Sequence, residues 1–186
     1  ALAKCAGDIA HLASTEVAEV SEPFVPGRGG SSAMPHKRNP VSATVILAAF
    51  GAAKGHAATL LDAMAAAHER PAGAWHAEWL ALPQLFGLAS GALREARALA
   101  EGLVLDPERM RRNLDLTGGL LFADAAAGRL GAALGRGAAH ALVERAAGAV
   151  RESGRPLAEV LAGMTEGAGV DPAPALDPAL RPRASP

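Results

Sequence analysis

The chain has 186 residues, half of them apolar, and its 18 Lys and Arg against 19 Asp and Glu give a formal net charge of -1 at pH 7. An apolar fraction of this size supports a buried core, and the length suggests one domain or two small ones. Because the charges nearly cancel and form no long run of one sign, the composition argues against partners such as nucleic acid or a membrane surface.

The cysteine and hydropathy patterns limit the compartment. Cys5 is the single cysteine, so an internal disulfide is excluded, and no second Cys or clustered His stands at metal-ligand spacing. No apolar run approaches the roughly 20 residues that cross a bilayer, and the N-terminus lacks the pattern of a secretory signal. We therefore predict a cytoplasmic protein with no metal site and no membrane span.

Hydrophobic spacing predicts helices in the first half of the chain. Apolar residues at three- and four-residue steps place a first helix over about residues 1–20, and Pro23 and Pro26 stop it. Pro40 fits the first turn of a second helix, predicted for Val41 to about Ala67. No segment shows the alternation of a convincing strand.

A third helix is predicted from about His76 to Gly102, with Pro83 in its first turns or at a kink. The short connection predicts that it lies antiparallel to the second. With 3% aromatic residues, these helices must pack closely through Ala and Gly.

The pattern changes after Asp106, which is a plausible helix cap followed by a proline. We predict a domain boundary here, with a bundle segment over 1–112 and a small helical domain over 113–186 that ends in a Pro-rich tail, 171–186. Shorter helices are predicted at about Leu120 to Leu134, Gly137 to Ser153 and Pro156 to Ala162.

The stretch GRGGSSAMPHKRNPVSAT, Gly27 to Thr44, interrupts the helices. Its glycines allow positive φ, which suits a flap over a ligand. Its side chains supply hydroxyls, positive charge and an amide donor just before a helix N-terminus, a set that suits a small polycarboxylate. The alternative from the residues alone is an ordinary solvated linker. The polar residues concerned are Ser31, Ser32, Lys37, Arg38 and Asn39.

The segment GSSAMPHKRNP, Gly30 to Pro40, resembles the signature G-S-S-x-M-P-x-K-x-N of the fumarase/aspartase superfamily. Members form or break a bond β to a carboxylate by elimination or its reverse. HERPAGAWHAEW, His68 to Trp79, is similar to the 3-carboxy-cis,cis-muconate cycloisomerases of protocatechuate breakdown, whereas adenylosuccinate lyases continue there into a Ser-rich sequence. Many members have a glutamate at the position of Thr44. The absence of this glutamate is a further resemblance to the cycloisomerases.

We call residues 22–40 the signature loop, and the resemblance implies roles for several of its residues. Ser31 matches the acid/base serine of the superfamily, with Ser32 as a neighbouring donor, while Lys37 and Asn39 stabilise the negative charge that grows on a substrate carboxylate. Further candidates for substrate binding are Met34, His36 and Arg70. The structural alternatives are that Met34 only shapes the loop, that His36 is a surface histidine, and that Arg70 forms a salt bridge at a helix end.

The resemblance also implies an all-α fold: part of a long-helix bundle of the fumarase/aspartase type plus a small helical C-terminal domain. It implies no metal or organic cofactor, and a homotetramer whose active sites draw residues from several chains. It covers only about the C-terminal half of a family member, and no capping residue precedes Ala1, so we expect further sequence upstream. Two other functions stay open: an adenylosuccinate-lyase-like elimination, and a catalytically silent oligomerisation fragment.

Overall fold

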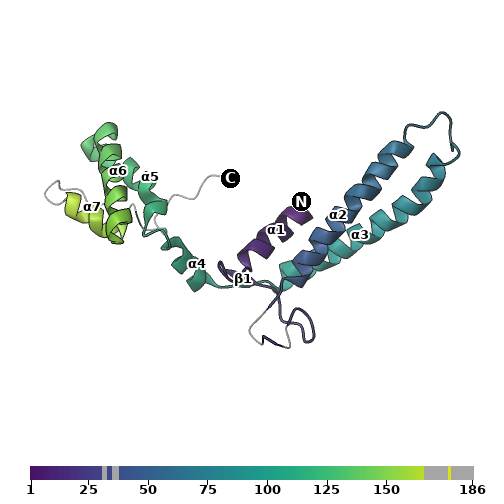
Figure 1. Ribbon diagram of the computed structural model, residues 1–186, viewed down its shortest axis with the longest axis horizontal. Coiled ribbons are helices and arrows are strands. Elements are labelled where there is room, and N and C mark those ends of the chain that lie inside the picture. Colours follow the sequence, from purple (N-terminus) through teal and green to yellow (C-terminus); the bar gives the residue numbers. More distant parts are fainter. Residues whose placement is uncertain (31–32, 35–37, 166–175, 177–186) are drawn as a thin grey trace. The chain divides into compact units, whose positions relative to one another are not determined.

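The computed structural model describes residues 1–30, 33–34, 38–165 and 176. Apart from two strands of two residues each, the regular structure in this part of the chain is helical, which confirms the all-α prediction (Figure 1). In chain order the elements are α1 (Leu2–Leu12), β1 (Val20–Ser21), α2 (Val41–Ala63), α3 (Ala74–Gly102), β2 (Val104–Leu105), α4 (Pro107–Leu114), the 3-10 helix η1 (Leu120–Phe122), α5 (Ala123–Leu134), α6 (Arg136–Ser153) and α7 (Leu157–Thr165).

The chain divides into two compact units, residues 1–109 and 110–186. The division falls inside α4, close to the boundary inferred from the sequence. Asp106 caps this helix as predicted, because its Oδ1 accepts a hydrogen bond of 2.8 Å from the backbone N–H of Arg109. In the second unit α5, α6 and α7 enclose an apolar core of small and branched side chains, among them Leu130, Ala139, Ala146, Leu157 and Leu161.

The first unit is a long hairpin of α2 and α3, with α1 packed against it (Figure 1). Alanines make up most of its buried side chains, so the helix backbones approach closely, as the low aromatic content predicted. Pro83 lies inside α3, in the third turn of that helix. The core of this unit comprises Ala6, Ala43, Ile46, Ala49, Ala92 and Leu99.

The first helix is shorter than predicted, because it ends at Leu12 rather than near residue 20. The Ser14 hydroxyl donates to the carbonyl of His11, and Ala18 takes a positive φ of 53°, so the chain turns back. This reversal delivers Val20 to an antiparallel pairing with Leu105. The sequence did not indicate these strands, since two residues are too few to show an alternation.

Helix α2 corrects a second prediction, that no apolar run approaches the length of a membrane span. Within the described residues, this one helix is long and apolar enough to cross a bilayer by length and composition. Only 11% of its most apolar window is buried within the chain. Length and composition do not distinguish a membrane span from a helix that other helices cover. In either case the exposed apolar side chains of α2 need to be covered by other helices or by lipid.

Candidate active site

The two ends of the signature loop are tied together at Gly29 and Asn39. The carbonyl of Gly29 accepts hydrogen bonds from the backbone N–H of Asn39, at 2.9 Å, and from its side-chain Nδ2, at 3.1 Å. Gly29 has a φ of 73°, and a Cβ there would lie 2.8 Å from the Asn39 carbonyl oxygen. Glycine is therefore required at this position both by the backbone angle and by the close approach.

This geometry predicts different effects for two neighbouring substitutions. Gly27→Ala and Gly29→Ala share the cost of a positive φ, roughly 1–2 kcal/mol, but no atom of the described residues lies within 4 Å of a Cβ at Gly27. Only Gly29→Ala must move Asn39, so we expect it alone to lower kcat/KM, by about 10²-fold. Steady-state kinetics of both variants, with melting temperatures as the control for stability, would test this. Equal losses would contradict it.

Glu22 caps α2 from outside the helix. Its two carboxylate oxygens accept hydrogen bonds of 2.9 Å from the backbone N–H groups of Ser42 and Ala43, while the N–H of Val41 donates to the carbonyl of Asn39. The first-turn donors are thus already paired. A carboxylate of the chain itself therefore occupies the N-terminus of α2.

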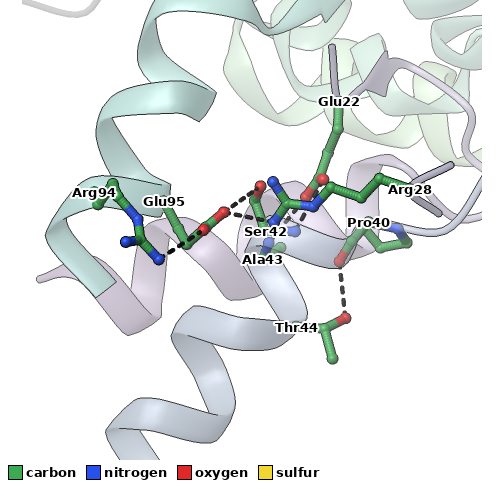
Figure 2. Close-up of polar contacts among 8 residues, drawn as sticks. All are labelled: Glu22, Arg28, Pro40, Ser42, Ala43, Thr44, Arg94 and Glu95. Atoms are coloured by element: carbon green, nitrogen blue, oxygen red, sulfur yellow. Dashed lines mark hydrogen bonds and ion pairs between the residues drawn. The ribbon is translucent and has the colours of Figure 1, made fainter. Parts of the chain in front are cut away.

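Glu95 on α3 holds the other side of the loop base. Figure 2 shows its carboxylate between Arg28 and Arg94, with the Ser42 hydroxyl beside it. Oε2 accepts from Arg28 Nη2 at 2.6 Å and from Ser42 Oγ at 2.9 Å, whereas Oε1 lies 3.8 Å from Arg94 Nη2. The bonds from Arg28 and then Ser42 hold the pKa of the Glu95 carboxyl below its usual value, against the effect of burial.

Two hollows lie beside the loop base. A cavity of about 190 Å³ is lined by Arg28, Arg38, Asn39 and Ser42 among others. A larger, more open hollow of about 1080 Å³ runs from Met34, Arg38 and Asn39 to the turn after α1 and to β2. Arg38 is shared by both and lies over the ring of Phe24, 5.6 Å from its centroid. Arg38 offers a positive charge to an anionic small molecule, whereas Glu16, Asp106 and Glu108 line the larger hollow with negative charge.

The predicted site residues divide into three groups. Met34 and Asn39 line the larger hollow, although Asn39 also ties the loop together. Arg70 lies at the far end of the α2–α3 hairpin (Figure 1). The remaining four, Ser31, Ser32, His36 and Lys37, lie outside the described residues.

Arg70 is separated from the loop by the length of α2, whose 23 residues span about 34 Å. It has a positive φ of 53°, and its guanidinium lies 5.7 Å from the centre of the Trp75 ring. Trp75, His76 and Trp79 contact one another through their rings at the start of α3. Within one chain, Arg70 and the signature loop are therefore not brought to the same site.

Sequence reasoning missed the three residues that hold the loop base, Glu22, Arg28 and Glu95. Glu95 left a signal: it lies at helical steps from Leu88, Ala92 and Leu99, where a buried face predicts an apolar residue. A charge on such a face requires a partner. Nothing in the sequence around Glu22 or Arg28 indicates that either residue holds the loop base. In the described part of the chain, no group of three or more His, Cys, Asp or Glu is placed to hold a metal.

Comparison with known proteins fits this arrangement. A family model described as Lyase matches residues 1–55. Nitrosuccinate lyase of Streptomyces davaonensis is 51% identical over 166 residues, which are 89% of this chain and 35% of that protein. The 3-carboxy-cis,cis-muconate cycloisomerase of Pseudomonas putida is 52% identical over 144 residues, which are 77% of this chain and 34% of that protein.

A solved structure agrees with the sequence matches. The crystal structure of the 3-carboxy-cis,cis-muconate lactonizing enzyme from Pseudomonas putida superposes with a TM-score of 0.87 at 46% identity. The superposition covers 96% of this chain and 41% of that one. The chain thus spans about a third of the length of the curated relatives that it matches.

Long antiparallel helices, a signature loop at their base and these matches define the class. The chain belongs to the fumarase/aspartase superfamily of lyases. Within that superfamily it is similar to the 3-carboxy-cis,cis-muconate cycloisomerases, with about 50% sequence identity over most of its length.

Proposed function

We propose that the protein that contains this chain is a cycloisomerase, which converts 3-carboxy-cis,cis-muconate to 4-carboxymuconolactone in protocatechuate degradation. The observation that carries the proposal is the complete signature motif, Gly30 to Pro40, in a chain 52% identical to the cycloisomerase of Pseudomonas putida. Arg38 and Asn39, which line both hollows beside the loop base, offer a positive charge and an amide donor to a polycarboxylate ligand.

The proposed reaction is an intramolecular addition. One carboxylate oxygen of the substrate forms a bond to an alkene carbon, and the enzyme's acid delivers a proton to the neighbouring carbon, so the substrate trianion gains one proton and becomes a lactone dianion. The carboxylate next to that carbon carries extra negative charge in the transition state. Lys37 and Asn39 are proposed to stabilise this charge, with Ser31 as the acid/base and Ser32 as a neighbouring donor. No cofactor is needed for these steps.

Assembly into a homotetramer, with active sites shared between chains, is part of the proposal. Large apolar side chains are exposed along α2 and α3, including Phe50, Leu61, Leu80 and Phe86, and would be covered by neighbouring subunits. If Arg70 binds substrate, it must reach the loop of a second chain, because its own loop lies a helix length away. A tetramer that covers α2 in this way fits a cytoplasmic enzyme.

A second candidate function is elimination from nitrosuccinate. It is favoured by one observation, the 51% identity to the nitrosuccinate lyase of Streptomyces davaonensis over 89% of this chain. Both reactions build negative charge on a carboxylate and use the same loop chemistry. Adenylosuccinate elimination and a silent oligomerisation module remain the two alternatives from the sequence.

One set of assays distinguishes these functions. The protein, with all the sequence it has in the cell, would be given 3-carboxy-cis,cis-muconate, nitrosuccinate and adenylosuccinate in parallel. We expect loss of the ultraviolet absorbance of the muconate, with kcat/KM at least 10²-fold above that for the other two. Release of nitrite at the higher efficiency would replace the cycloisomerase with the lyase. Turnover of none would leave the oligomerisation module.

A further inference from the structure

Glu95 is unusual among the described residues because it is an ionisable side chain inside the fold. The buried polar residues in this part of the chain are Ser42, Glu95 and Thr165, and Glu95 is 9% exposed. A carboxylate removed from water must be compensated by charged and hydrogen-bonded partners, which Arg28 and Ser42 provide. Its Cβ lies on the α3 face that contributes Ala92 and Leu99 to the core.

A buried ion pair by itself is weak evidence for a contribution to stability, because well-packed apolar side chains often do as well or better. What this pair does achieve is a fixed geometry. A single oxygen, Glu95 Oε2, accepts from both Arg28 and Ser42, so three segments meet at one atom: the loop arm, the first turn of α2, and α3. A carboxylate oxygen with two donors allows little freedom to any of them.

The connection continues into the signature loop. Arg28 is the immediate neighbour of Gly29, whose carbonyl accepts both hydrogen bonds from Asn39. The position of Asn39 is thus set by Glu95 through Arg28 and Gly29 on one side. It is set through the start of α2 on the other side, since the Asn39 carbonyl accepts from Val41 and Ser42 is bound to Glu95. A change at Glu95 reaches Asn39 from both directions.

We propose that Glu95 is a positioning residue for the signature loop: it fixes the Gly29–Asn39 base against the α2–α3 hairpin, so that the loop donors meet the growing charge of the substrate. The role in catalysis rests on the proposed function, whereas the role in fixing the base does not. Glu95 itself touches the loop arm and α2, and acts through Arg28 and Ser42.

The first test is Glu95→Gln, read by hydrogen exchange in the protein with all its natural sequence. The amide keeps the shape of the side chain but loses the charge that holds Arg28. We expect the backbone N–H of Asn39 to exchange at least about 10-fold faster, because its bond to Gly29 opens more often. The matched control is Glu101→Gln, which breaks the exposed ion pair with Arg97 on the same helix and should leave this exchange unchanged.

The second test measures kinetics on whichever of the three substrates the unmodified protein converts. Glu95→Gln should lower kcat by about 10- to 100-fold with KM changed less than threefold, because misplaced donors act on the transition state. In a double variant with Arg28→Gln, the two losses should not multiply, since both break the same contact. Should Glu95→Gln fail to fold, Arg28→Gln alone carries both tests from the loop side.

Two results would overturn the proposal. One is unchanged exchange at Asn39 in Glu95→Gln. The other is faster exchange with kcat within twofold of the parent, whether or not the melting temperature falls, which would mark the pair as structural. If the unmodified protein converts none of the substrates, the proposed function fails, and the exchange experiment alone decides whether Glu95 fixes the loop base.

Discussion

Replacing Lys37 by alanine is expected to lower kcat by roughly 10²- to 10³-fold, because the variant loses a cation that stabilises charge formed only in the transition state. Ser31→Ala should abolish turnover, since it removes the proposed acid/base. KM should change far less than kcat in Lys37→Ala if the interaction is made mainly in the transition state. Steady-state kinetics on 3-carboxy-cis,cis-muconate, with circular dichroism and light scattering on the same samples, would measure these effects.

The matched control for Lys37 is Lys4→Ala. Lys4 is an exposed lysine on α1 that pairs with Asp8, and exposed pairs of this kind contribute about 0–1 kcal/mol. Its loss should leave kcat, helicity and assembly unchanged. Near-normal activity in both Ser31→Ala and Lys37→Ala would remove the catalytic role assigned to the signature loop, whatever substrate the protein uses.

Phe86→Glu on α3 is expected to dissociate the assembly and, with it, to abolish activity. Phe86 is 68% exposed in the chain, among other exposed apolar side chains on α2 and α3. A carboxylate placed in an interface between helical hairpins would be desolvated without a partner, which costs several kcal/mol. Light scattering should show a species smaller than a tetramer. The helix content of the separated chains should be retained, because the substitution lies outside the core of the unit.

Arg97→Gln is the control on the same helix, because its side chain is exposed and polar and pairs with Glu101, one turn further along α3.

A mixing experiment separates assembly from site sharing. Protomers with Lys37→Ala and protomers with Arg70→Ala, each of lowered activity alone, should regain activity when they are unfolded and refolded together. Recovery fails if each site is built from one chain, and a tetrameric Phe86→Glu would show that α3 lies outside the interface.

Helix positions followed from local rules. Proline placement and apolar periodicity gave the start of α2 at Val41 and the end of α3 at Gly102, and the Asp-Pro pair at residue 106 gave the cap of α4. These features depend on neighbouring residues, so a single sequence contains them. The signature motif is local in the same sense, because its residues are consecutive, and for that reason it indicated the superfamily without any knowledge of the tertiary contacts.

The sequence by itself thus determined the helical class and the superfamily, and it predicted the loop residues of the candidate site. Tertiary structure alone decided that α1 ends at Leu12, that Glu22 caps α2, and that Glu95 holds Arg28 across 67 positions of sequence. It also placed Arg70 in the connection between α2 and α3, a helix length away from the loop. The physical reason is that caps and buried charges are satisfied by whichever partner the fold brings near, and a glutamate paired far along the chain looks no different from one in solvent.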